Sequence, residues 1–177
     1  DWQVIVFDKL TYASNGLNRL RDVNVFDDKR VLTLTTDFTH SIPIGIIQEI
    51  QDIDYIVHMG AETHVDKSIE NAEPFVLSNV LGTLYMLELA RKLPNLKLFI
   101  QFSTDEVFGP APEGINWKEW DRYNCTNPYA ATKAGAEQLA SAFRNTYRLP
   151  IIITNTMNVY GERQDIEKFI PSTIKKV

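Results

Sequence analysis

Short apolar runs alternate with longer amphipathic stretches along the whole of this 177-residue chain. Runs rich in β-branched and aromatic residues favour strands, and apolar residues three or four positions apart favour helices between them. Alternation of this kind predicts βαβ units. The predicted fold class is therefore α/β, a doubly wound, mostly parallel sheet of the Rossmann type with helices on both faces. The expected strands cover residues 3–7, 30–35, 54–59, 96–101 and 150–155.

Proline marks the start of three predicted helices, because its missing N–H is not needed at the first helical position. Asn127, directly before Pro128, has a side chain suited to an N-cap. Residues 110–123 are rich in Pro, Gly, Trp and charge and are expected to form a surface loop or lid. The expected helices cover residues 43–50, 74–92, 128–147 and the stretch from about 167 onward.

Composition excludes several classes of protein. The net charge of −5 offers no basic footprint for nucleic acid. No apolar run reaches the roughly 18 residues of a membrane span, and no targeting segment is recognisable. The single cysteine, Cys125, fits a reducing compartment, so a cytoplasmic protein is expected. His58 and His64 have no third ligand at a metal-like spacing, and His58 is expected in the core.

A polar segment, Ser103-Thr104-Asp105-Glu106, follows the apolar run at 96–101. Open α/β sheets bind their ligands at the carboxyl ends of their strands. Two adjacent carboxylates at such a place suit the roles of acid and base when their surroundings separate their pKa values. The simpler alternative is a polar loop with solvated acids, and this segment alone does not decide between the two.

Tyr129 and Lys133 stand four residues apart and share one face of the helix expected over 128–147. An ammonium beside a phenol favours the phenolate, so Lys133 is predicted to lower the pKa of Tyr129. Tyr129 then becomes a candidate base. A Tyr–Lys pair on a solvated helix face is the alternative, but the pair opens a Pro-capped helix after a strand that ends in Ser-Thr. That context favours a catalytic pair.

Asp8 ends the first predicted strand, where a dinucleotide fold places an acid for the ribose hydroxyls. The Gly-rich turn that accompanies such an acid would precede Asp1 by this spacing. Either the chain is a fragment or Asp8 is an ordinary acid at a strand end. Gly60 and Ala61, after the strand at 54–59, allow a ligand to approach the backbone closely.

With these motifs the chain resembles the extended short-chain dehydrogenase/reductase family. Within it, the chain is most similar to the nucleotide-sugar 4,6-dehydratases of the dTDP-glucose 4,6-dehydratase type. The resemblance covers nearly the whole sequence. It rests on residues 8–13, 61–69, 103–109, 127–133, 158–161 and 167–171.

The resemblance implies NAD as cofactor and a nucleotide sugar as substrate. Tyr129 would take the proton of the 4-hydroxyl group, with Lys133 lowering the Tyr129 pKa and Thr104 hydrogen-bonding the 4-oxygen. Glu106 would remove the C5 proton and Asp105 would protonate the departing C6 hydroxyl. The implied cofactor-binding residues are Asp8, Lys9, Leu10, Thr11, Asp37, Ala61, Tyr129 and Lys133. The implied substrate-binding residues are Glu62, His64, Ser103, Thr104, Asp105, Glu106, Asn158, Glu167 and Lys168.

By the same resemblance, residues 1–177 form an NAD-binding domain truncated at both ends. It lacks its first strand and Gly-rich loop, and the substrate-binding portion begins at about 158–177. A homodimer through the helices at 74–92 and 128–147 is expected. Two alternatives stay open: a nucleotide-sugar 4-epimerase of the same fold, which needs no acid–base pair, and a non-catalytic nucleotide-sugar-binding or scaffold module. The base of the nucleotide is not determined.

Overall fold

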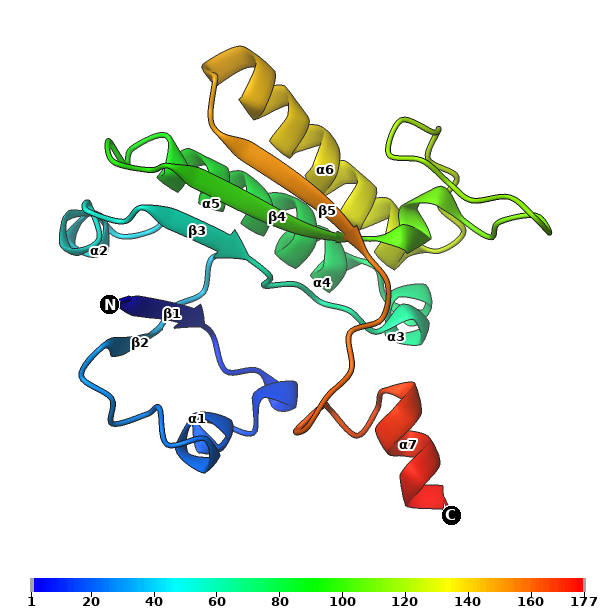
Figure 1. The fold of residues 1–177 in the computed structure, drawn as a ribbon, viewed down its shortest axis with the longest axis horizontal. Coiled ribbons are helices and arrows are strands. Elements are labelled where there is room, and N and C mark those ends of the chain that lie inside the picture. The colour runs from blue at the N-terminus through cyan, green and yellow to red at the C-terminus, as the bar shows by residue number, and fades with distance from the viewer. Residues whose placement is uncertain (1, 177) are drawn as a thin grey trace. The chain divides into compact units, whose positions relative to one another are not determined.

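The computed structural model describes residues 2–176, which fold as two compact units (Figure 1). The larger unit spans Phe38–Met157. The smaller unit combines the residues up to Asp37 with those from Asn158 onward.

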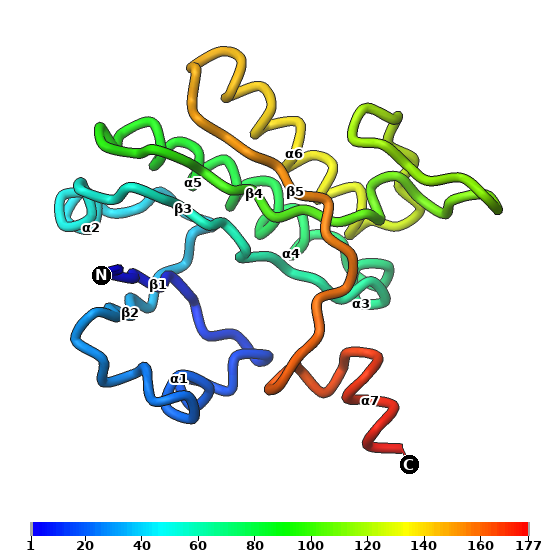
Figure 2. Tube along the Cα trace, viewed as in Figure 1, coloured from blue at the N-terminus to red at the C-terminus, as the bar shows by residue number. Residues whose placement is uncertain are grey.

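A three-stranded parallel sheet forms the centre of the larger unit, in the order β3-β4-β5. The strands β3 (Tyr55–His58), β4 (Leu98–Thr104) and β5 (Ile151–Thr156) run side by side in Figure 2. The ladder between β4 and β5 extends from Phe99 opposite Ile151 to Thr104 opposite Thr156. Parallel strands require crossover connections, which helices supply here.

One face of this sheet is covered by helices. α4 (Glu73–Phe75), the π-helix η2 (Val76–Leu81) and α5 (Gly82–Ala90) form one continuous rod, and α6 (Pro128–Tyr147) lies beside it (Figure 1). Phe99 and Leu87 are fully buried between these helices and the sheet.

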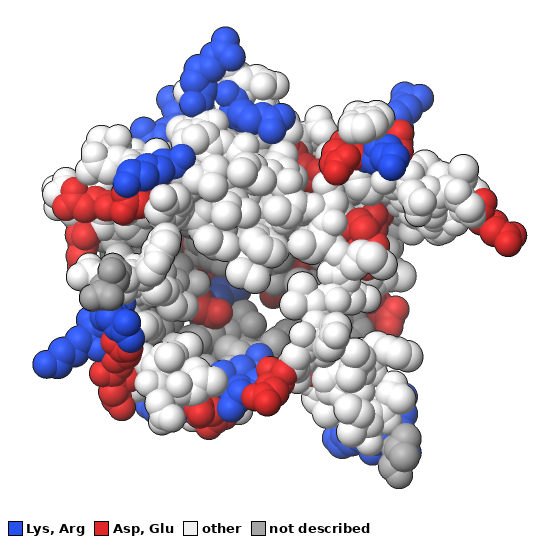
Figure 3. Space-filling model, in the orientation of Figure 1, with Lys and Arg blue, Asp and Glu red and all other residues white. Residues whose placement is uncertain are grey.

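The opposite face carries the other side chains of the same strands, since successive residues of a strand point to opposite sides. Val57 is 52% exposed and Ile152 is 50% exposed there. Figure 3 shows a broad uncharged surface over this part of the molecule. Within Phe38–Met157, the helices that pack on the β3–β5 sheet therefore cover one of its faces.

Three short elements complete the larger unit: α2 (Ile44–Glu49), α3 (Val65–Glu70) and the 3₁₀-helix η3 (Asp105–Phe108). In the smaller unit, β1 (Val4–Asp8) pairs with β2 (Val31–Thr35) in parallel. Its helical elements are η1 (Tyr12–Ser14), α1 (Asn18–Asp22) and α7 (Phe169–Lys176). No helix between residues 2 and 176 combines the length and the apolar character needed to cross a membrane.

The predicted parallel α/β architecture is confirmed, and all five expected strands are present. The largest difference from an expected boundary lies at the end of β4. The strand expected to end at residue 101 continues to Thr104, because its ladder with β5 continues that far, and η3 replaces the expected loop. The hydrogen bonds also divide the strands into two sheets, of two and three strands.

His58 is the core histidine that the sequence predicted, with 4% of its surface exposed. Its ring stacks edge-on against Phe38, with centroids 5.3 Å apart, and its Nε2 lies 3.2 Å from the Thr83 hydroxyl. Burial, with a smaller contribution from the Lys133 charge, lowers the His58 pKa to about 3. The folded protein therefore keeps this imidazole neutral in mildly acidic solution.

We expect His58 to make the protein acid-sensitive. Below an unfolded-state pKa of about 6.5, the unfolded chain binds a proton that the folded chain does not, so stability falls as the pH drops from that value toward the folded pKa. Between about pH 7.5 and about pH 5.5 this residue should remove about 1.4 kcal/mol of unfolding free energy. Urea denaturation at both pH values should show a smaller loss for His58→Gln than for the wild type. Equal losses in the two proteins would contradict the prediction.

Candidate active site

The carboxyl end of β4 turns directly into η3, which brings Thr104 and the two adjacent acids to one place. The Thr104 hydroxyl accepts a hydrogen bond from the Glu106 backbone N–H at 3.2 Å and so caps η3. It also lies 3.3 Å from Asp105 Oδ1. Gly109 ends the turn at φ +71°, and a Cβ there would collide with the Asn124 carbonyl oxygen. Glycine is therefore required where the chain leaves the acids.

The start of α6 is held by two side chains. Asn127 Oδ1 accepts from the Ala130 N–H at 2.8 Å, which confirms the predicted N-cap. The Ser68 hydroxyl, from α3, accepts from the Tyr129 N–H at 3.1 Å. Ser68 is fully buried and donates in turn to the Val65 carbonyl at 2.6 Å. Two of the N–H groups that a helix start leaves unpaired are thus satisfied.

Tyr129 lies in contact with the segment that ends β4. The neighbouring Thr104 hydroxyl favours a lower pKa for this phenol, but burial and the nearby Glu106 charge act more strongly. Together they raise the pKa of Tyr129 to about 12. The prediction that Lys133 lowers this pKa is wrong for the chain by itself, and the phenol is neutral at physiological pH.

Lys133 is the second buried member of the pair, with 5% of its surface exposed. Burial lowers the pKa of its ammonium to about 8, against the opposing charge of Glu137. Its Nζ donates to the Phe102 carbonyl at 2.7 Å. The ammonium thus binds the backbone of β4, and Lys133 is not among the groups that shift the Tyr129 pKa.

A buried carboxylate, Glu137, joins the strands to α6 one helical turn after Lys133. Its Oε1 accepts from the Ser103 hydroxyl on β4 and from Asn155 Nδ2 on β5, the latter at 2.8 Å. Its Oε2 accepts from the Tyr123 hydroxyl at 2.6 Å. Only 2% of Glu137 is exposed. Three donors compensate the burial of one charge, which otherwise is strongly unfavourable.

The segment after β3 is fixed by Asn79, which sits in the π-helix η2. Asn79 Oδ1 accepts from the Glu62 N–H at 2.8 Å, and its Nδ2 donates to the Glu62 carbonyl and to the Thr132 hydroxyl, each at 3.0 Å. Two residues later, His64 caps α3 through its Nδ1, which accepts from the Lys67 N–H at 3.4 Å. π-helical turns often occur at functional sites, and this one ties residue 62 to α6.

Apart from Ala61, which follows β3 in the larger unit, the remaining predicted residues belong to the smaller unit. Asp8 Oδ1 accepts from the Leu10 N–H at 2.6 Å, and Leu10 adopts a left-handed φ of +55°. Lys9 Nζ lies 3.9 Å from Asp37 Oδ2. The structure therefore brings Asp8, Lys9, Leu10 and Asp37 together around the carboxyl ends of β1 and β2. Thr11 follows directly as the residue before η1.

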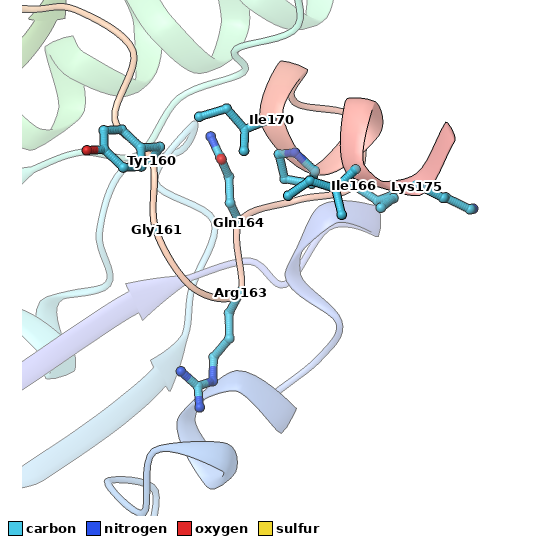
Figure 4. A pocket seen from close by; sticks show the side chains of 9 residues that line it. Tyr160, Gly161, Arg163, Gln164, Ile166, Ile170 and Lys175 are labelled. Carbon is cyan, nitrogen blue, oxygen red and sulfur yellow. The ribbon is translucent and has the colours of Figure 1, made fainter. Parts of the chain in front are cut away.

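A cavity of about 420 Å³ lies in the C-terminal part of the smaller unit. Figure 4 shows Tyr160, Gln164 and Ile170 around it, while the Arg163 side chain points away toward α1. Consistent with that direction, Arg163 Nε lies 4.0 Å from Asp22. The predicted residues Asn158, Glu167 and Lys168 do not line this cavity. Glu167 instead accepts from the Tyr12 hydroxyl at 3.4 Å.

Sequence reasoning missed Glu137, Ser68 and Asn79 as parts of the site. Each is a polar residue at a position that the helical pattern assigns to the core. A single sequence does not distinguish such a residue from an ordinary polar residue on the surface. Between residues 2 and 176, no three His, Cys, Asp or Glu side chains lie close enough to hold a metal ion.

The sequence profile of a family described as GDP-mannose 4,6 dehydratase matches residues 1–177. A dTDP-glucose 4,6-dehydratase of Streptomyces niveus is 40% identical over 171 residues, which cover 96% of this chain and 48% of that protein. The crystal structure of a dTDP-glucose 4,6-dehydratase from Streptomyces venezuelae, with NAD bound, aligns with a TM-score of 0.88 at 38% identity. The alignment covers 98% of this chain and 52% of the other.

A UDP-glucuronic acid 4-epimerase from Bacillus cereus, crystallised with UDP-glucuronic acid and NAD, aligns with a TM-score of 0.86. The alignment covers 98% of this chain and 54% of that one, at 24% identity. At this identity the likeness shows a shared fold. The chain spans about half the length of the relatives named here.

The three hydrogen bonds that Glu137 accepts lead to a prediction about stability. Glu137→Gln replaces one accepting oxygen by an amide NH₂, so at least one of the three donors loses its partner inside the protein. We expect a loss of about 1–3 kcal/mol of unfolding free energy, measured by urea denaturation. The control is Glu88→Gln, which removes only the exposed ion pair with Arg91 and should cost less than about 1 kcal/mol. Similar losses in both variants would contradict the assignment.

Proposed function

Because the chain belongs to the GDP-mannose 4,6-dehydratase family, we propose that this protein is an NAD-dependent nucleotide-sugar 4,6-dehydratase, a lyase. Its proposed reaction converts a nucleotide-linked glucose into the 4-keto-6-deoxy sugar and water. The observation that carries the proposal is the meeting of two adjacent carboxylates with a buried Tyr–Lys pair. Asn127 Nδ2, at the start of the helix that carries Tyr129 and Lys133, donates to Glu106 Oε2 at 3.0 Å, and the Glu106 charge contributes to the raised Tyr129 pKa.

The donors and acceptors of the chain fit NAD. Asp8 ends a parallel strand with a carboxylate, the group that accepts hydrogen bonds from ribose hydroxyls in dinucleotide folds. The Lys133 ammonium has three N–H groups, of which the bond to Phe102 uses one. We propose that Asp8, Lys9, Leu10, Thr11, Asp37, Ala61, Tyr129 and Lys133 bind the cofactor.

When bound, NAD supplies the hydride acceptor for C4 and later the hydride donor for C6, and its oxidised ring adds a positive charge that favours a phenolate. Tyr129 takes the proton of the 4-hydroxyl group, and Thr104 hydrogen-bonds the oxygen as it becomes a ketone. The ketone acidifies the C5 hydrogen. Glu106 accepts that proton while the C5 electrons form the C5–C6 double bond. Asp105 gives its proton to the departing C6 hydroxyl, so water leaves, and Glu106 returns its proton to C5 when C6 receives the hydride.

Further parts of the proposal concern recognition and assembly. We propose that Glu62, His64, Ser103, Asn158, Glu167 and Lys168 contact the substrate together with the catalytic residues. Residues 1–177 then belong to an NAD-binding domain whose first strand and Gly-rich loop are not among them, and the substrate-binding portion begins at about 158. A cytoplasmic homodimer through the α4–α5 rod and α6 completes the proposal. Val76 and Leu77 on that rod are both nearly half exposed.

Product mass tests the proposed function. The full-length protein, incubated with NAD and a panel of nucleotide-glucoses, should convert one of them to a product lighter by one water. Mass spectrometry then also identifies the nucleotide. A product of unchanged mass with altered sugar stereochemistry would replace this function by a 4-epimerase. No turnover of any sugar would favour a non-catalytic binding module.

The separate roles proposed for Asp105 and Glu106 lead to a second prediction. Glu106→Gln should retain oxidation at C4 but stall before elimination, because an amide cannot accept the C5 proton. Stopped-flow absorbance should show the reduced cofactor accumulating, with turnover lowered by at least about 100-fold. Glu113→Gln, in the exposed loop after Gly109, is the control and should turn over normally. Wild-type turnover in Glu106→Gln would refute the assigned role.

A further inference from the structure

Asn127 does more than cap α6. While its Oδ1 accepts from the Ala130 N–H at 2.8 Å, its Nδ2 donates to Glu106 Oε2 at 3.0 Å. The backbone N–H is a donor only, so the atom that faces it must be the amide oxygen. The amide nitrogen therefore faces the carboxylate, and the orientation of the Asn127 side chain is determined by the helix that it caps.

The two bonds of Asn127 connect Glu106, the proposed base for the C5 proton, to the helix start that carries the Tyr129 phenol. Tyr129 lies two residues after Asn127, and the hydroxyl of buried Ser68 accepts from its backbone N–H. Glu106 is tied from its own side by the Thr104 hydroxyl, which accepts from its N–H. The Glu106 carboxylate is thus the end of a flexible side chain whose position is set by the start of α6.

The residue type matters at this position. Ser, Thr and Asp cap helices about as well as Asn does. Aspartate has no hydrogen to donate, and a serine hydroxyl is a single atom on a shorter side chain. Asparagine alone among these caps presents separate donor and acceptor atoms, one for each of the two partners observed here.

We propose that Asn127 is a positioning residue for the elimination step, holding the Glu106 carboxylate in the frame of the helix that carries Tyr129. This role rests on the proposed function. The bond engages Oε2, and Oε1 remains to take the C5 proton. Held in this way, the carboxylate does not have to find its reactive rotamer in each turnover, and such positioning contributes strongly to rate.

The test compares Asn127→Asp and Asn127→Ser in the full-length enzyme, with NAD and the nucleotide-glucose that the mass-spectrometry experiment identifies. Both variants keep a capping side chain, and the carboxylate of Asn127→Asp also interacts favourably with the positive end of the helix dipole. In single turnovers, the absorbance rise of C4 oxidation should stay within about twofold of wild type. Decay of that absorbance reports the return of hydride to C6, which must follow elimination, and it should slow about tenfold in Asn127→Ser. It should slow further in Asn127→Asp, whose carboxylate would face the Glu106 carboxylate.

A purely structural cap predicts another pattern. Asn127→Asp would then resemble the wild type, or both phases would slow together in the two variants, and either result would overturn the proposal. Ser68→Ala provides the matched control, because it removes the other side-chain bond to the start of α6 without touching Glu106. It should lower the melting temperature and affect both phases alike.

A thermal-unfolding cycle separates this inference from the proposed function. If the amide holds the carboxylate, Asn127→Ser and Glu106→Ala should each lower the melting temperature, and the double variant should lower it no further than the larger single change. Additive shifts would show that the two side chains are not coupled and would overturn the inference. If coupling is found but the wild type forms no dehydrated product, the proposed function fails and the catalytic role of Asn127 fails with it.

Discussion

The larger unit depends on one buried charge. Glu137 lies on α6 and accepts hydrogen bonds from side chains on β4, on β5 and in the loop at residues 110–123. These three hydrogen bonds compensate the removal of the carboxylate from water, and they join segments that are distant in sequence. The consequence is that the carboxyl end of β4 has one defined position against α6. Because β4 carries Thr104 and the adjacent acids, and α6 carries Tyr129 and Lys133, the same cluster determines how the candidate catalytic groups face one another.

Burial determines the charge state of those groups. It raises the pKa of Tyr129 and lowers that of Lys133, so each change opposes the charged form of its side chain. The Glu106 charge also raises the Tyr129 pKa, and the Thr104 hydroxyl opposes that rise. The Glu137 charge opposes the lowering of the Lys133 pKa. The protein alone therefore keeps a neutral phenol close to a weakly acidic ammonium. A positive charge beside the Tyr129 phenol would favour its phenolate form, which is the base. The oxidised ring of the proposed cofactor carries such a charge.

Much of the fold could be predicted because its signals are local. Alternating apolar runs located five strands, and Asn127-Pro128 located the start of the longest helix within one residue. The predictions failed where non-local pairing decides. β4 continues to Thr104 because β5 supplies partners there, and the rod at 73–90 contains a π-helix in which Asn79 bonds the backbone of Glu62.

The sequence by itself determined the class of fold, the identity of the candidate acids and of the Tyr–Lys pair, and the cap that starts their helix, because each depends on residues within a few positions of one another. Only the tertiary structure decided which of these groups meet. The Lys133 ammonium binds the Phe102 carbonyl, Asn127 reaches Glu106 across 21 positions, and Ser68 caps a helix that begins 60 residues later. These bonds join segments far apart in the chain, and their strength comes from burial, which no local pattern of residues specifies.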